Sequence, residues 1–387
     1  MTTGTPSASK RVRTGTHFML GNHAVVEGAL AAGCSFFAGY PITPANEISE
    51  HMAARMPEVG GTFLQGEDEL FSVYAVTAAS LAGAKAMTAT ASAGYNYMQE
   101  GIEYAVSAEV PCVIVDVQRC RGENYATQAD IMQARWGAAG DHEMVVLAPS
   151  SVQELFDETI RAFNLAEKYR IPVIVLSETT IALMRENLVI PEPDQIEIVQ
   201  RARPTQPRDQ FVPFAAPPDG CPPLPAFGEG YRILHSINPH DERGGIRWNP
   251  DVFDRLYQRI TRKVLAHYED IVKTEAFYLD DAELGLVAYG SETRPALEAV
   301  EQARARGLRA GLLKLKTVWP VPEREIGALA AQCRVLFAVE MNIGKYAGEI
   351  ERVAGGRCEV VRVTKNRGLV HAPGEILAAI EKSLGGR

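Results

Sequence analysis

The chain contains no segment able to cross a membrane as a helix, and no surplus of positive charge. No run of about eighteen consecutive apolar residues occurs, and a helix needs roughly that length to span a bilayer. Asp and Glu outnumber Lys and Arg by 48 to 39, giving a formal net charge of −9. A surface of this sign is unsuited to neutralising the phosphates of nucleic acids or anionic lipids. We therefore predict neither a nucleic-acid partner nor a membrane.

Cysteine is sparse, and no two cysteines have the Cys-x-x-Cys spacing used by structural zinc and iron–sulfur sites. This absence predicts that any iron–sulfur cluster required by the function lies on another polypeptide. Most of the thiols are expected to fill core space in a reducing cytoplasm. Cys120, between two arginines, is the exception whose role stays open. The six cysteines are Cys34, Cys112, Cys120, Cys221, Cys333 and Cys358.

The length of 387 residues, with 46% hydrophobic and 22% charged residues, suits a globular chain of two domains. Residues 1–16 form a polar, basic leader without the apolar segment of a signal peptide, so we expect a cytoplasmic protein. The first domain is expected at 17–190 and the second at 280–387. Residues 191–279 would connect them.

Short apolar runs alternate with longer helical patterns in both expected domains, which is typical of layered α/β folds with parallel sheets. The run at 112–117 is almost continuously apolar, as a buried parallel strand requires. We predict two three-layer α/β domains, of which the first is doubly wound. Between 191 and 249 proline and glycine are dense, which indicates either a flexible linker or an arm that packs on a partner. A long amphipathic helix is predicted over 252–272.

Two short motifs place reactive side chains where strands give way to helices. They are Gly-Tyr-Pro-Ile-Thr-Pro at 39–44 and Gln-Gly-Glu-Asp-Glu at 65–69. Judged by residue type alone, Thr43 would cap the following helix. The acids around Glu67 would likewise be favourable neighbours of a helix N-terminus. The residues alone therefore leave a structural and a catalytic role open.

The ordered series of motifs in the first domain resembles the α subunit of the 2-oxoacid:ferredoxin (or other acceptor) oxidoreductases. The series adds Met-Thr-Ala-Thr-Ala at 87–91 and Val-Asp-Val-Gln-Arg at 115–119 to the two motifs above. The resemblance implies a thiamine-diphosphate pyrimidine-type domain at 17–190. For 280–387, with Trp-Pro-Val-Pro at 319–322, it implies a transketolase C-terminal-like domain.

The same resemblance assigns roles to individual residues. Glu67 falls at the family's glutamate that activates the cofactor's pyrimidine ring by proton transfer. Thr43 and Arg119 fall at contacts to the 2-oxoacid, whose carboxylate a guanidinium binds through two parallel hydrogen bonds. The turn residues implied to line the cofactor are Pro41, Ile42, Thr90 and Ala91.

The loop that follows Arg119 departs from the family's Gly-, Pro- and Ser/Thr-rich pattern, since it reads Cys-Arg-Gly-Glu-Asn-Tyr at 120–125. Arg121 would suit a second substrate carboxylate, as in 2-oxoglutarate. Tyr125 would suit an aryl or branched 2-oxoacid such as phenylglyoxylate. The sequence leaves these alternatives open.

No Gly-Asp-Gly occurs, the motif with which thiamine enzymes hold the metal of the diphosphate. The resemblance therefore implies a hetero-oligomer in which a β subunit binds the diphosphate and Mg²⁺. Iron–sulfur [4Fe-4S] clusters would lie on partner subunits, with γ and ferredoxin-like subunits expected. Oxidative decarboxylation would use coenzyme A and yield acyl-CoA and CO₂. Ferredoxin, or NAD through a flavin subunit, would accept the electrons.

Two other functions are alternatives to an oxidoreductase subunit. One is a noncatalytic scaffold with a thiamine-domain fold, in which Glu67 and Thr43 are merely residues at helix starts. The other is a nicotinamide dehydrogenase, which is disfavoured because no Gly-x-Gly-x-x-Gly follows the first strand.

Overall fold

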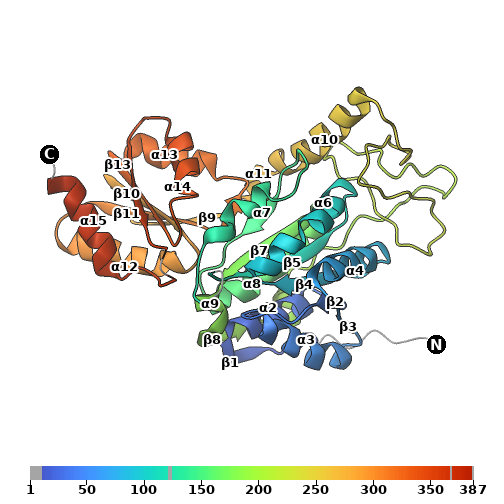
Figure 1. Cartoon of the computed structure of the whole chain (residues 1–387), viewed down its shortest axis with the longest axis horizontal. Coiled ribbons are helices and arrows are strands. Elements are labelled where there is room, and N and C mark those ends of the chain that lie inside the picture. Colours follow the sequence, from blue (N-terminus) through green and yellow to red (C-terminus); the bar gives the residue numbers. More distant parts are fainter. Residues whose placement is uncertain (1–10, 121–123, 367, 386–387) are drawn as a thin grey trace.

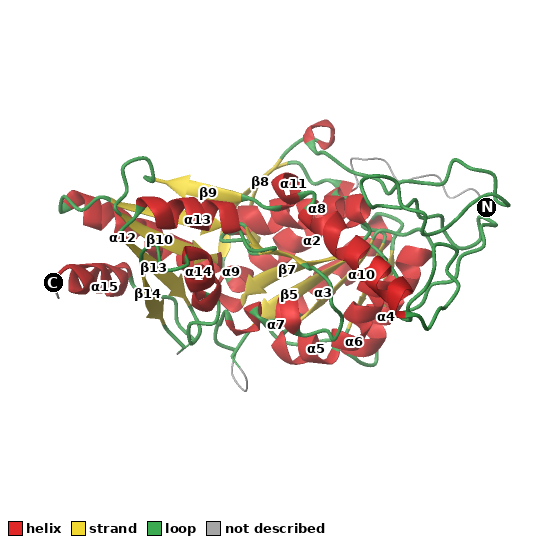
Figure 2. Ribbon diagram, turned by 90° about the horizontal axis from the view of Figure 1, so that it is seen from above, coloured by secondary structure: helices red, strands yellow, loops and turns green. Residues whose placement is uncertain are grey.

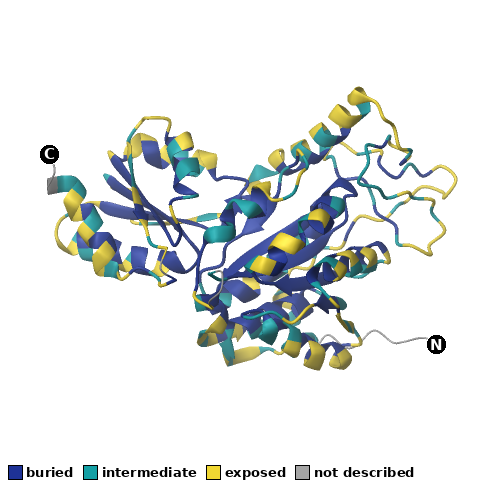
Figure 3. Ribbon diagram, viewed as in Figure 1, coloured by how far each residue is buried: buried dark blue, intermediate teal, exposed yellow. Residues whose placement is uncertain are grey.

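The computed structural model describes residues 11–120, 124–366 and 368–385. Two α/β units lie side by side, and a long coiled arm covers the end of the larger unit that lies away from the smaller one (Figure 1). Both sheets are buried, whereas exposed residues follow the outer sides of the helices and the arm (Figure 3). No helix among the described residues has the length and apolarity needed to cross a membrane.

The larger unit is built on a seven-stranded sheet of order β12-β6-β7-β5-β4-β2-β3. All neighbouring strands are parallel except β12, which pairs antiparallel with β6. Helices α2, α3 and α8 cover one face, and α4, α5 and α6 cover the other. The strands are β2 (Phe36–Gly39), β3 (Thr62–Gln65), β4 (Ala86–Thr90), β5 (Cys112–Gln118), β6 (Val145–Leu147), β7 (Pro172–Glu178) and β12 (Thr317–Trp319). The helices are α2 (Gly21–Ala31), α3 (Asn46–Glu58), α4 (Glu69–Leu81), α5 (Ser92–Tyr97), α6 (Gln99–Ser107), α7 (Gln133–Trp136), α8 (Val152–Tyr169) and α9 (Thr179–Leu183). The predicted doubly wound architecture is confirmed.

The smaller unit is a five-stranded sheet of order β14-β13-β10-β11-β9. Helices α12 and α15 cover one face, and α13 and α14 cover the other, so the predicted three-layer arrangement is also confirmed. The hydrophobic core under α13 and α14 is continuous with the core under α4, α5 and α6 of the larger unit. The strands are β9 (Thr274–Phe277), β10 (Leu284–Tyr289), β11 (Ala310–Leu315), β13 (Val335–Glu340) and β14 (Glu359–Thr364). The helices are α12 (Thr293–Ala305), α13 (Glu323–Gln332), α14 (Ala347–Ala354) and α15 (Pro373–Gly385).

Several elements differ from the sequence-based expectation. Strands β1 (Gly15–Leu20) and β8 (Arg185–Ile190) form a separate antiparallel pair. Strand β12 comes from the second half of the chain but extends the first sheet, so the two units interlock. The helix predicted over 252–272 is divided into α10 (Pro250–Leu265) and α11 (Tyr268–Ile271).

Helix α14 begins only at Ala347, although the helical pattern of the sequence starts at 343, because a side chain imposes a turn first. The Asn342 Oδ1 atom accepts hydrogen bonds from the backbone N–H groups of Gly344 (2.8 Å) and Lys345 (2.9 Å). An asparagine side chain that bonds nearby backbone in this way competes with helix formation.

The arm at 191–249 packs on its own chain, an arrangement that neither proposed reading of this segment included. Arg201 is buried and donates to Glu167 Oε2 (2.7 Å) and to the carbonyl oxygen of Ser80 (2.6 Å). The Phe227 N–H donates to the Leu81 carbonyl at 2.8 Å. These contacts fix the arm over the amino ends of the large sheet, so it is not a flexible linker (Figure 2).

Candidate active site

The carboxyl edge of the large sheet collects the predicted site residues. Strands β5, β4, β2 and β3 are consecutive neighbours and parallel, so all four end at one edge. Thr43 follows β2, Glu67 follows β3, Thr90 ends β4, and Arg119 follows β5. In parallel α/β sheets this edge is where ligands bind.

The turn after β2 is fixed by two asparagines. Asn46 Nδ2 donates to the Thr43 hydroxyl oxygen at 3.1 Å. Buried Asn22 of α2 donates to the Pro44 carbonyl at 2.7 Å and to Glu47 at 2.9 Å. Helix α3 begins without a side-chain cap, so Thr43 does not act as its N-cap. The Thr43 hydroxyl thus accepts a bond from Asn46 and keeps its own proton for another acceptor.

The three acids at 67–69 have three different environments. Asp68 is the N-cap of α4, and its carboxylate accepts from the Phe71 N–H at 2.7 Å. Glu69 is buried at 8% exposure and lies against Gly94. Glu67 is exposed and has no hydrogen-bond partner within the described ranges. The helix-start role therefore belongs to Asp68, which leaves the Glu67 carboxylate free.

The turn after β4 is tightly packed by its own chain. Thr90 and Ala91 are fully buried. A Cβ atom added to Gly94 would overlap Thr90 Oγ1 and Glu69 Oε1. Internal packing alone therefore requires glycine at this point of α5.

The backbone of Arg119 is held by hydrogen bonding to Ser92, whereas its guanidinium makes one hydrogen bond among the described residues, to Asn124. The Ser92 hydroxyl oxygen accepts from the Arg119 N–H at 3.1 Å and lies 3.1 Å from the Arg119 carbonyl oxygen, while its proton is shared with the closer Asp130 carboxyl. Arg119 Nη1 donates to the neutral Asn124 side chain at 2.9 Å. The guanidinium retains further donors for an anionic ligand. Tyr125 is 53% exposed and lies against Gly368 of the smaller unit. Arg121 lies outside the described residues.

Two carboxyl groups beneath this edge, those of Asp116 and Asp130, were not among the predicted site residues. Asp116 is fully buried in β5 beside Asp130, and in the described part of the chain no N–H or hydroxyl group donates to its carboxyl oxygens. Burial, together with neighbouring Asp130, raises the pKa of Asp116 well above its ordinary value. Asp130 accepts a hydrogen bond from Ser92, the residue that holds Arg119. The signal in the sequence is an acid within an otherwise apolar run, which by its periodicity predicts only a buried strand.

One glutamine joins the two units next to this edge. The Gln128 backbone N–H donates to the Met341 carbonyl at 2.9 Å. Gln128 Nε2 donates to the Tyr289 carbonyl at 2.8 Å and to Glu178 Oε1 at 2.7 Å. Glu178, at the end of β7, also accepts from the N–H of Ser291 at 3.1 Å and from its hydroxyl. The junction is therefore made of buried polar contacts.

We expect this junction to make stability depend on pH. Burial raises the pKa of Glu178 to about 7, despite hydrogen bonds from Ser291 and Gln128 that oppose the rise. Between the ordinary value of about 4.5 and 7 the folded chain holds a proton that the unfolded chain releases. The free energy of unfolding therefore falls by roughly 3 kcal/mol as pH rises through that window, and levels off above it.

Thermal unfolding of the wild type and of Glu178→Gln from pH 5 to pH 8 measures this effect. Glutamine mimics the protonated carboxyl, so the variant should lack the decline that this group contributes. Identical pH profiles for the two proteins would contradict the assignment of the proton to Glu178.

Comparison with known proteins identifies the family of the chain. Residues 27–257 match the family model described as pyruvate flavodoxin/ferredoxin oxidoreductase, thiamine diP-bdg. Residues 282–372 match the pyruvate:ferredoxin oxidoreductase core domain II. The 2-oxoglutarate synthase subunit KorA of Methanothermobacter marburgensis is 47% identical over 95% of this chain and 99% of its own length. The ketoisovalerate oxidoreductase subunit VorB of the same organism is 36% identical over 88% of this chain and 91% of its own.

A solved structure of a 2-oxoacid:ferredoxin oxidoreductase is also similar to this chain. The 2-oxoglutarate:ferredoxin oxidoreductase from Magnetococcus marinus, with 2-oxoglutarate, coenzyme A and succinyl-CoA bound, superposes with a TM-score of 0.89 at 29% identity. The match covers 96% of this chain and 66% of that one. A split-gene transketolase superposes with a TM-score of 0.55 at 13% identity, which shows a shared fold alone.

Proposed function

Because this chain belongs to the family of 2-oxoacid:ferredoxin oxidoreductase α subunits, we propose that it serves the coenzyme A-dependent oxidative decarboxylation of a 2-oxoacid. The observation that carries the proposal is the placement of three unlike groups on one sheet edge. They are the free carboxylate of Glu67, the hydroxyl of Thr43 and the guanidinium of Arg119. A noncatalytic scaffold would not need Glu67 to be free, since Asp68 already caps the helix.

2-Oxoglutarate is the substrate we propose. The support is the 47% identity to a subunit named for 2-oxoglutarate synthesis, against 36% to one named for ketoisovalerate. Arg119 would bind one carboxylate of this dianion, and Arg121 the other. Thr43 would donate to the carboxylate next to the reacting carbonyl. Tyr125 would then border the entrance rather than line an aromatic pocket, in keeping with its exposure.

The residues at the edge fit thiamine diphosphate. The cofactor supplies the nucleophilic carbon and the electron sink that decarboxylation requires. Glu67 would share a proton with its pyrimidine ring, for which an exposed, unpaired carboxylate is suited. Pro41 and Ile42 would give the ring an apolar border, and buried Thr90 and Ala91 would support it from below. The diphosphate with Mg²⁺, and the [4Fe-4S] clusters, would be held by partner subunits.

The surface around Glu67 is suited to such a partner. Strand β3 is an edge strand, and Leu64 is exposed on it. Phe71 of α4 (40% exposed) and Tyr97 of α5 (51%) lie on adjacent elements. Aromatic side chains grouped on a surface are typical of protein interfaces. We propose that the β subunit covers this face and completes the site, with γ and ferredoxin-like subunits elsewhere in the complex.

Purification of the chain with its co-expressed partner subunits tests the function. Coenzyme A-dependent reduction of a viologen dye is measured with 2-oxoglutarate, 2-oxoisovalerate and phenylglyoxylate. The highest kcat/KM is expected with 2-oxoglutarate. A complex that contains bound thiamine diphosphate but prefers another acid would overturn the substrate assignment. A complex without the cofactor and without activity would favour the scaffold.

Arg119→Ala in the same complex should mainly weaken substrate binding. A charge-assisted hydrogen bond contributes about 1.5–3 kcal/mol, so the KM for the 2-oxoacid should rise by roughly ten- to a hundredfold. The change in kcat should be smaller. The KM of Arg119→Lys is expected to lie between those of the wild type and Arg119→Ala, because an ammonium group keeps the charge but cannot reproduce the two parallel bonds. An unaltered KM would show that Arg119 does not contact the substrate.

A further inference from the structure

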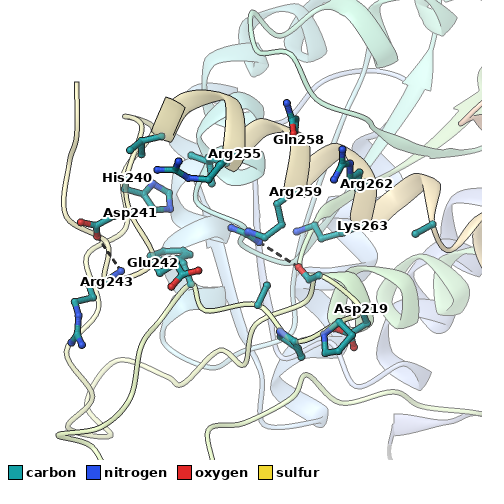
Figure 4. A pocket seen from close by; sticks show the side chains of 18 residues that line it. Asp219, His240, Asp241, Glu242, Arg243, Arg255, Gln258, Arg259, Arg262 and Lys263 are labelled. Carbon is teal, nitrogen blue, oxygen red and sulfur yellow. Dashed lines mark hydrogen bonds between the residues drawn. The ribbon is translucent and has the colours of Figure 1, made fainter. Parts of the chain in front are cut away.

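A cavity lies at the edge of the large sheet opposite the candidate active site, and we propose that it binds a ligand with two or more phosphate groups, of the size of a nucleoside diphosphate. Its volume is about 870 Å³, and it lies between the arm and helix α10 (Figure 4). This volume is within the range of small-molecule sites. The inference is independent of the reaction proposed for the carboxyl edge.

The position of the cavity follows from the contacts of α10 with the amino ends of two strands. Glu109 precedes β5, and Arg170 precedes β7. Lys263 of α10 donates to Glu109 at 2.7 Å and to the Arg170 carbonyl at 2.9 Å. Arg119 is at the other end of β5, so the length of that strand, about 20 Å, separates the cavity from the candidate active site.

Helix α10 presents a row of arginines to the cavity. Arg255, Arg259 and Arg262 all line it and are four and then three residues apart along the helix; Arg259 points toward the arm, and Arg255 and Arg262 lie to either side of it (Figure 4). Across from them the arm contributes Arg243 and His240. Arg243 is the cation on this wall, because burial lowers the pKa of His240 and leaves its imidazole neutral at neutral pH.

Only part of this charge is neutralised inside the protein. Arg259 donates to both carboxylate oxygens of Glu109, at 2.6 and 2.8 Å, and Lys263 shares the same carboxylate. One anion therefore serves two cations. Arg255 and Arg262 are exposed and have no hydrogen-bond or ion-pair partner among the residues that the structure describes. Two guanidinium groups remain available to a ligand.

The acids on the cavity wall are mostly engaged elsewhere. Asp241 accepts from the N–H groups of Arg243 (3.0 Å) and Gly245 (2.9 Å) and forms an ion pair with Arg247 at 2.9 Å. Asp219 accepts from the Cys221 N–H at 2.9 Å. Glu242 is the remaining acid of the lining. Only Asp241 is paired with a cation, so among the described lining residues the unpaired guanidinium groups of Arg243, Arg255 and Arg262 outnumber the unpaired carboxylates of Asp219 and Glu242.

The layout indicates the class of ligand. Arg255 and Arg262 are two helical turns apart, about 10 Å along the axis, so one phosphate would not satisfy both. Guanidinium groups bind phosphate oxygens through paired hydrogen bonds. Pro217 and Pro218 are exposed at the rim and offer an apolar surface for a base. A nucleoside diphosphate combines these features.

Isothermal titration calorimetry of the full chain with ADP, at constant ionic strength, tests the proposal. Saturable one-site binding is expected for the wild type. Arg255→Gln/Arg262→Gln should raise the dissociation constant at least about tenfold, because each charge-assisted bond lost costs more than 1.4 kcal/mol. The control Arg306→Gln/Arg362→Gln removes the same charge from exposed positions of the smaller unit and should leave binding unchanged.

Inorganic pyrophosphate is titrated in parallel. Tighter binding of ADP than of pyrophosphate supports a nucleotide-sized site, whereas equal or weaker binding of ADP contradicts it. Absence of saturable heat with either compound overturns the proposal. Equal weakening in the cavity variant and in the control variant overturns it as well, since binding would then reflect overall charge. Unchanged circular dichroism and melting temperature establish that the variants are folded.

Discussion

Glu67→Gln in the assembled enzyme is expected to lower kcat by about 10²- to 10⁴-fold, the range typical of losing a general acid–base group. Glutamine keeps the shape of the side chain but cannot hold the shared proton. Glu67 is exposed and unpaired within the described residues, so the substitution should leave folding and subunit assembly unchanged. Dye reduction under saturating substrate, with cofactor content measured in the same sample, checks the prediction.

The neighbouring acids supply the matched controls. Asp68→Asn should retain turnover, because asparagine is as good an N-cap for α4 as aspartate. Glu69→Gln tests the other carboxylate near the turn, which is buried against Gly94. A large loss of turnover in Glu69→Gln with none in Glu67→Gln would move the catalytic role to Glu69. Full turnover in all three variants would support the scaffold.

The largest effect on stability is expected from Glu109→Gln. Burial alone would raise the pKa of Glu109, but Lys263 and Arg259 outweigh it and hold that pKa well below its ordinary value. The Lys263 and Glu109 side chains are fully buried, at 2.7 Å from each other. Removing the anion leaves an uncompensated buried cation, which costs about 3–5 kcal/mol. Urea unfolding of the purified chain at neutral pH measures the loss.

A surface pair provides the contrast. Glu351 accepts two hydrogen bonds from Arg362, at 2.6 and 2.7 Å, but both side chains are well exposed. Glu351→Gln should therefore lower the free energy of unfolding by no more than about 1 kcal/mol. Equal decreases in the free energy of unfolding for Glu109→Gln and Glu351→Gln would show that the buried Glu109 ion pair stabilises the fold no more than an exposed pair does.

The sequence determined the two α/β units and the edge on which the candidate site lies. The strand predicted at 112–117 is β5, because a short, almost continuously apolar run between helical patterns leaves few alternatives. Placing Thr43, Glu67 and Arg119 after parallel strands was enough to put them on one edge. The family resemblance followed from the order of the motifs, and the matched family models confirm it.

Side-chain contacts between distant segments were not predictable from the pattern. Asn342 delays a helix through a local turn that hydrophobic periodicity does not register. Strand β12 joins the first sheet although it lies in the second half of the chain. Which of the acids at 67–69 caps α4 depended on backbone geometry, so the free carboxylate of Glu67 became visible only in the structure.

Sequence by itself thus determined the local elements, the layered architecture and the family, because these follow from periodicity and from the order of motifs. Tertiary structure alone decided which polar groups meet in the interior. Asp116 comes to lie beside Asp130, and Lys263 reaches Glu109 across 154 residues of chain. The physical reason is that burial and the partner's charge, not residue type, set the protonation and the strength of such contacts. Both depend on how the whole chain packs.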